Sequence, residues 1–179
     1  MDAVIIYESL TGTTQRAARL IGDGFYDHQI GSQLFPLASV DPAAIDAADV
    51  VIIGTWTDGL LIVGQKPARK KKLRELPRLD GKPCFVFCTY AIHPGKTLPK
   101  LTKLVTELGG QVLGGLTVRR DHVDEDIADF VAGAAPAIAA LPPKRVPEPL
   151  PTREQAAVSE AAPTDATADD AAEPEPADA

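Results

Sequence analysis

Three short runs in this chain consist mostly of large apolar residues, and they constrain the fold more than any other feature. They are Ala3–Tyr7, Val50–Gly54 and Pro83–Thr89. Because these runs are apolar on both faces, they predict central parallel strands covered by helices on each side, rather than strands with one face in water. Two further segments, Gln33–Pro36 and Gln111–Arg119, bring the number of predicted strands to five.

Helical segments separate the predicted strands. After the first strand, apolar residues at steps of three and four from Thr14 to Phe25 mark one face of an amphipathic helix. Further helices are predicted over residues 42–48, 68–76, 98–108 and 124–141. Parallel strands joined by helices require right-handed crossovers, so the pattern predicts an α/β fold, a three-layer doubly wound sandwich around a five-stranded parallel sheet. In such sheets ligands bind beyond the carboxyl ends of the strands, which directs attention to the loops after the first, third and fourth strands.

The loop after the first strand is rich in hydroxyl groups. A helix N-terminus has backbone N–H groups without partners and a partial positive charge, and Ser and Thr side chains add donors, so such a loop can bind a phosphate. The alternative is that these are ordinary cap and turn residues. The loop has neither the glycine triplet of dinucleotide-binding loops nor the lysine of nucleotide-triphosphate loops. Its candidate binding residues are Ser9, Leu10, Thr11, Gly12, Thr13 and Thr14.

This segment resembles the signature of the flavodoxin family. That signature has two apolar residues, an aromatic, a hydroxyl residue, a small residue and a threonine, followed by a helical alanine and an aliphatic residue. The matching positions here are Ile5, Ile6, Tyr7, Ser9, Gly12, Thr14, Ala18 and Ile21. The resemblance implies a strand order of 2-1-3-4-5 and non-covalent binding of flavin mononucleotide (FMN). It also implies that the residues of this loop hold the FMN phosphate through neutral donors, which favours FMN over FAD.

The segment after the third predicted strand contains Trp56, the only tryptophan of the chain. Flavodoxins with a Thr-Trp pair at this place stack the indole on one face of the isoalloxazine ring, and Thr55-Trp56 followed by Asp58 is similar to that pattern. The alternative is a tryptophan that packs on the surface of its own domain. The candidate cofactor-binding residues of this loop are Thr55, Trp56, Thr57, Asp58 and Gly59.

The loop after the fourth predicted strand places Tyr90 where many flavodoxins have a tyrosine on the opposite flavin face. With Trp56 it would form an aromatic sandwich; the alternative is a tyrosine that ends a strand at the sheet edge. His93 is either a proton donor at the flavin edge or an exposed loop histidine. The candidate cofactor-binding residues of this loop are Thr89, Tyr90, His93 and Gly95.

The sequence also departs from the family pattern. Flavodoxins commonly have a glycine directly after the stacking residue, and its peptide flips to accept a hydrogen bond from the flavin semiquinone. Thr57 occupies that position here, and the nearest glycine is Gly59. The resemblance therefore does not imply the usual stabilisation of the semiquinone in this chain. The fourth loop lacks the Gly-Asp that often precedes its tyrosine, and no insertion divides the fifth strand, which is typical of a short-chain flavodoxin.

A run of basic residues follows the tryptophan segment. Electron-carrying flavodoxins are typically acidic around the flavin, so this run invites three interpretations: attraction of an acidic redox partner, binding of the phosphates of a nicotinamide cofactor, or a raised flavin potential. The simplest alternative is a solvated helix face. One patch offers few phosphate contacts, so we expect no nucleic-acid binding. The run comprises Lys66, Arg69, Lys70, Lys71, Lys72 and Arg74.

The composition divides the chain into two regions. Residues 142–179 contain eight prolines, nine acidic residues and three basic ones, with no aromatic residue, and such a segment cannot bury a core. We therefore predict an FMN-binding domain over residues 1–141 and a disordered Pro/Ala/acidic tail over residues 142–179. The net charge of −7 belongs mainly to the tail, because residues 1–141 have a net charge of only −1.

Other features limit the class of protein. No apolar run approaches the roughly 20 residues that span a bilayer, and no signal sequence is visible, so we expect a cytoplasmic protein without membrane insertion. The spacing of the two cysteines, Cys84 and Cys88, along one strand is too wide for a disulfide and predicts buried thiols. Neither the cysteines nor the three histidines have metal-ligand spacing, so no metal site is expected.

Three functions are compatible with these patterns. The first is an FMN-dependent electron carrier, a monomer or weak dimer without a catalytic side chain, in which the flavin does the redox chemistry. The second is an NAD(P)H-dependent FMN reductase of quinones or similar acceptors, with a contribution from the basic run and His93. The third is a binding or regulatory module of the same fold that has lost its flavin.

Overall fold

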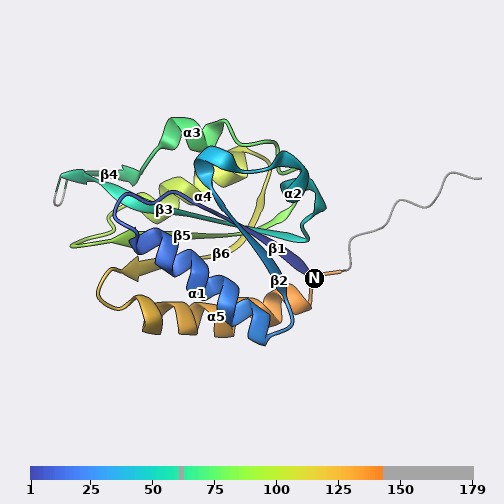
Figure 1. Ribbon diagram of the computed structural model, residues 1–179. Helices are drawn as coiled ribbons and strands as arrows, with labels where there is room; N and C mark the ends of the chain where they lie inside the picture. The colour runs from blue at the N-terminus through green and yellow to red at the C-terminus, as the bar shows by residue number, and fades with distance from the viewer. Residues whose placement is uncertain (61–62, 143–179) are drawn as a thin grey trace, which may run out of the picture. The chain divides into compact units, whose positions relative to one another are not determined.

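The computed structural model describes residues 1–60 and 63–142, and its centre is a parallel sheet (Figure 1). Five strands lie in the order β2-β1-β3-β5-β6, and every neighbouring pair in that order is parallel. These strands are β1 (Asp2–Tyr7), β2 (Gly31–Pro36), β3 (Val50–Leu60), β5 (Pro83–Tyr90) and β6 (Gln111–Arg119). The predicted order 2-1-3-4-5 is therefore confirmed for the five parallel strands.

Helices cover both faces of the sheet, as Figure 1 shows. α1 (Thr13–Asp27) and α5 (Val123–Ala139) pack on one face against a core that includes Ile5, Ile52 and Phe87. The other face packs against a second core under α2 (Pro42–Ala47), α3 (Lys70–Arg74) and α4 (Thr97–Glu107), and a short 3-10 helix, η1 (Leu37–Ser39), follows β2. The predicted three-layer sandwich is confirmed, because alternate residues of the apolar strands enter the two cores.

The third strand is longer than predicted, and a sixth strand follows it. The predicted end at Gly54 is wrong: β3 continues to Leu60 and pairs with β4 (Val63–Pro67) in an antiparallel hairpin, in which Thr57 lies opposite Pro67. Trp56 is thus the last residue of β3 that pairs with β5, not a loop residue. The predicted helix over residues 68–76 is also shorter, because Arg69 adopts a left-handed conformation with φ of 51° directly before α3.

Both cysteines are buried free thiols, as predicted. They lie on β5 and are fully inaccessible to solvent. Burial raises the pKa of Cys84 to about 12, although the charge of Lys82 opposes the shift, and burial raises the pKa of Cys88 to about 11. The folded protein therefore holds both thiol protons at a pH where an exposed thiol has lost them.

This difference predicts that stability falls in alkaline solution. Because unfolded thiols lose their protons near pH 9 and folded ones do not, each thiol stabilises the fold below pH 9, and this contribution decreases as the pH rises toward 11. Between pH 8 and pH 10 we expect a loss of about 1 kcal/mol per thiol in the free energy of unfolding, measured by urea titration. The double variant Cys84→Ala/Cys88→Ala should lose less stability over this interval. An unchanged slope in that variant would contradict the assignment to the thiols.

No helix within residues 1–60 and 63–142 is both long and apolar enough to cross a membrane. Apart from Pro142, the predicted tail over residues 142–179 lies outside the described residues.

Candidate functional site

The first loop turns sharply into α1 and leaves the start of this helix without a side-chain cap. Gly12 has a φ of 88°, a left-handed conformation that glycine adopts without strain, and its N–H donates to Ser9 Oγ at 3.1 Å. α1 begins at the next residue, and no side chain accepts a hydrogen bond from its first N–H groups. Of the alternative roles given for these hydroxyls, capping of α1 is therefore absent, whereas Ser9 does act as a turn residue. The amides of its first turn remain open to an anion.

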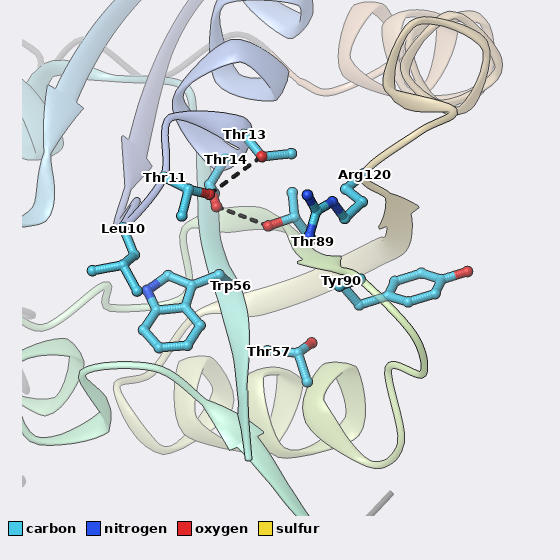
Figure 2. Close-up of a pocket in the computed structure, with 10 residues that line it drawn as sticks. Leu10, Thr11, Thr13, Thr14, Trp56, Thr57, Thr89, Tyr90 and Arg120 are labelled. Carbon is cyan, nitrogen blue, oxygen red and sulfur yellow. Dashed lines mark hydrogen bonds between the residues drawn. The ribbon is translucent and has the colours of Figure 1, made fainter. Parts of the chain in front are cut away.

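A pocket of about 170 Å³ opens at the carboxyl ends of β1, β3 and β5 (Figure 2). Three segments that are far apart in the sequence meet there, as the doubly wound topology predicts. Eight of the candidate residues from the sequence line this pocket: Leu10, Thr11, Thr13, Thr14, Trp56, Thr57, Thr89 and Tyr90. Ala91 and Arg120 complete the lining, and neither was among the candidates.

Hydroxyl groups form one wall of the pocket. Thr14 Oγ1 and Thr89 Oγ1 form a hydrogen bond of 2.8 Å, and both side chains are buried, with 1% and 4% of their surface exposed. This bond ties the first turn of α1 to the end of β5. Thr11 and Thr13 lie above the pair, with their own hydroxyl oxygens 3.5 Å apart (Figure 2). Because this contact is at the limit of hydrogen bonding, these two hydroxyls are available to a ligand.

Two buried polar atoms on the pocket wall lack a partner. Trp56 Nε1 and Thr57 Oγ1 make no hydrogen bond within the described residues. The Thr57 hydroxyl lies near enough to the Cys88 thiol to oppose the rise in its pKa, but the contact does not meet hydrogen-bond geometry. Buried polar groups without partners are rare and costly in folded proteins, so these atoms favour a ligand with polar groups along this wall.

The two aromatic side chains do not face each other in this structure. Trp56 lies beside Leu10 on one side of the pocket, and the Tyr90 ring extends to the opposite side and away from the cavity (Figure 2). The stacking role of these rings stays a prediction.

A second pocket of about 180 Å³ adjoins the first and shares Thr57 and Ala91 with it. Gly59 and His93 also line it, and Ile92 beside them is 65% exposed. Each pocket alone is smaller than the roughly 300 Å³ of a typical small-molecule site, but together they form a groove between the end of β3 and the loop after β5. A ligand with two distinct parts fits such a groove better than a compact one.

The remaining candidates lie around this groove. His93 is exposed, and its Nδ1 accepts a hydrogen bond of 2.9 Å from the Gly95 N–H, which fixes the loop after β5. Thr55 is fully buried, and its hydroxyl donates to the Ala68 carbonyl at 3.3 Å. Asp58 forms an ion pair with Lys66 at 3.6 Å on the β3–β4 hairpin. Thr55 and Asp58 therefore support the hairpin that forms one side of the groove, and neither lines the two pockets.

Arg120 is a lining residue that the sequence reasoning missed. It directly follows β6, the edge strand of the parallel order, and its N–H donates to the Tyr90 carbonyl at 3.0 Å. The only sequence signal was its place immediately after the last predicted strand, and that loop was not among the three considered.

Comparison with known protein families identifies this arrangement. The model of the flavodoxin domain matches residues 4–137, from within β1 to near the end of α5. The chain belongs to the flavodoxin family. Membership of this family implies flavin binding, and the carboxyl-end groove is where its parallel sheet positions a ligand.

Solved flavodoxin structures share the fold. A flavodoxin from the domain Archaea is 18% identical, with a TM-score of 0.62 over 78% of this chain and 99% of its own. Flavodoxin 1 from Bacillus cereus is 21% identical, with a TM-score of 0.62 over 79% of this chain and 100% of its own. The rubredoxin oxygen:oxidoreductase from Desulfovibrio gigas is 19% identical, with a TM-score of 0.57 over 78% of this chain and 37% of that larger protein. No curated protein sequence matches this flavodoxin at a significant level.

Proposed function

We propose that residues 1–141 bind FMN non-covalently and that the bound flavin carries electrons between protein partners. The observation that supports this best is that hydroxyl groups from α1 and β5 and the only tryptophan of the chain line the same groove. The donors suit a phosphate, and the apolar surface of Trp56 suits a planar ring. FMN combines both parts in one molecule, and it supplies one- and two-electron redox chemistry when bound.

The residues of the groove have separable roles in this proposal. The N–H groups at the start of α1, with the hydroxyls of Thr11 and Thr13, would bind the phosphate. Trp56 Nε1 would donate a hydrogen bond to the ribityl chain or ring, and Thr57 Oγ1 would donate to or accept from polar groups there. The hairpin of β3 and β4 and the loop after β5 would exclude water from the flavin by flanking it.

The basic residues of α3 support an acidic protein partner. Lys70, Lys71 and Lys72 on α3 form no ion pair within the described residues, whereas Arg69 and Arg74 on either side pair with Glu8 and Glu107. Unpaired surface cations attract an acidic protein and raise its association rate at low salt. The exposed side chains of Leu10 and Ile92 at the groove rim add apolar contact area for such a partner.

The decisive experiment uses Trp56, because it is the only tryptophan and lines the groove. We expect FMN to quench its fluorescence until one FMN is bound per chain, and calorimetry to give the same stoichiometry. A protein that shows neither quenching nor heat with FMN would exclude a flavin-binding function.

A second measurement separates a carrier from a reductase. The FMN-loaded protein is mixed with NADPH without oxygen, and the flavin absorbance is followed. A carrier should keep its oxidised spectrum for many minutes and lose it rapidly only with a reductase or chemical reductant. Rapid bleaching by NADPH alone would favour an NAD(P)H-dependent FMN reductase.

A further inference from the structure

The turn between β6 and α5 holds Arg120 at the groove through its backbone. The Arg120 N–H donates to the Tyr90 carbonyl at 3.0 Å, which joins the turn to the end of β5. The preceding Arg119 N–H donates to Asp126 Oδ2 at 2.9 Å, which joins the turn to the first turn of α5. Because the backbone on both sides is fixed, the Arg120 side chain starts from a defined position at the pocket edge.

The side chain of Arg120 extends into the pocket toward the Thr14–Thr89 pair (Figure 2). It lines the same cavity as Thr11 and Thr13, the hydroxyl residues of the first loop. A cation therefore lies in a pocket whose other polar groups are neutral.

The other arginines near the first loop are already paired with carboxylates. Arg16 on α1 forms an ion pair with Asp124 at 2.6 Å, and Arg69 pairs with Glu8 at 3.6 Å. Within residues 1–60 and 63–142, the guanidinium of Arg120 makes no ion pair and no hydrogen bond, although its neighbour Arg119 pairs with Asp121 at 2.8 Å. Of these four arginines, Arg120 is the one with free donors, and it is the one in the pocket.

We propose that Arg120 binds the phosphate group of the flavin and makes this flavodoxin selective for FMN over riboflavin. This inference depends on the FMN binding proposed above. A phosphate monoester carries nearly two negative charges at neutral pH. The amides and hydroxyls of the first loop are uncharged, so they do not neutralise it. A guanidinium has five donors in a planar fork that matches two phosphate oxygens, so it adds both charge and hydrogen bonds at this point.

Two properties follow from the proposal. FMN binding weakens as salt concentration rises, because the side chain of Arg120 is exposed and its attraction to phosphate is screened. Riboflavin, which has no phosphate, binds with an affinity that depends on neither salt nor Arg120.

The test compares FMN with riboflavin in three single variants, with Trp56 fluorescence and calorimetry as readouts. In Arg120→Gln, we expect the dissociation constant of FMN to rise about tenfold at low salt, and that of riboflavin to change less than about twofold. Arg120→Lys keeps the charge without the planar fork and should give an intermediate FMN affinity. The matched control is Arg119→Gln, which removes one adjacent cation outside the pocket and should bind both flavins as the wild type does.

The outcomes separate this inference from the proposed function. If the wild-type protein binds neither flavin, the proposed function fails and the inference fails with it. If the wild type binds FMN but Arg120→Gln retains the wild-type ratio of FMN to riboflavin affinity and the wild-type salt dependence, only the inference is overturned. Equal weakening of both flavins in Arg120→Gln also overturns it, because the guanidinium would then act on the ring and not on the phosphate.

Discussion

Gly54→Ala is expected to destabilise the flavodoxin fold more than any other change considered for this chain. A Cβ atom at residue 54 would lie 2.0 Å from Phe87 Cζ, and the other two nearest atoms, also in the Phe87 ring, are at 2.2 and 2.6 Å. Gly54 and Phe87 are direct partners in the β3–β5 pairing, and both are buried, so neither strand can move aside without breaking the central sheet. The ring occupies the space that any side chain at residue 54 requires.

Overpacking in a rigid core typically costs 1–3 kcal/mol and occasionally more, and this overlap belongs at the upper end. We therefore expect Gly54→Ala to lose about 3 kcal/mol of unfolding free energy and to lower the melting temperature by about 10 °C. The measurement is thermal unfolding followed by circular dichroism on the full chain.

Gly133 provides the matched control for this change. It lies on the exposed face of α5, and no atom lies within 4 Å of the place that a Cβ would take there. Gly133→Ala should therefore be neutral or stabilise the protein by up to about 1 kcal/mol through helix propensity. If Gly54→Ala melts as the wild type does, the pairing of Gly54 with Phe87 is not the one described.

The apolar strands explain why the sequence predicts so much of this fold. Val50–Gly54 and Pro83–Thr89 are apolar on both faces, and only a parallel sheet covered on each side satisfies that pattern. The β3–β4 hairpin was missed because its residues, including Thr57 and Asp58, resemble a ligand-binding loop. Its closure also depends on positive φ angles at Gly59 and Gly64, and a sequence does not distinguish such glycines from those of an ordinary loop.

Arg120 could not be placed from the sequence for a different reason. The β5–β6 pairing shifts by one residue between Cys84 and Phe85, because Cys84 pairs with Val112 and Phe85 with Gly114. This irregularity determines that Arg119 lies opposite Tyr90 and that Arg120 follows at the pocket edge. A one-residue shift moves every later side chain to the other face of a strand, and no local pattern specifies it. The part of the pocket wall that comes from the loop before α1 could be predicted, because its residues are consecutive in the sequence.

Thr13→Val is expected to weaken FMN binding strongly and to leave riboflavin binding unchanged. Thr13 is the first residue of α1 and lines the pocket, and the weak 3.5 Å contact with Thr11 leaves its hydroxyl free to donate to a phosphate. A hydrogen bond to a charged group contributes about 1.5–3 kcal/mol, which corresponds to a rise of roughly 10- to 150-fold in the dissociation constant. Valine has nearly the same shape as threonine, so the change removes the hydroxyl and little else.

Thr13 is a better choice for this test than Thr14. The Thr14 hydroxyl is buried and bonded to Thr89, so its removal would combine a loss of stability with any loss of binding.

The matched control is Thr106→Val on α4, where the hydroxyl donates to the Thr102 carbonyl at 3.0 Å on an exposed helix surface away from the groove. It should bind both flavins as the wild type does. Calorimetric titration of FMN and riboflavin gives the two dissociation constants. If Thr13→Val weakens the binding of both flavins equally, the phosphate does not bind at the start of α1. Because the Thr13 hydroxyl is neutral, its contribution should persist at high salt, where that of a charged group is screened.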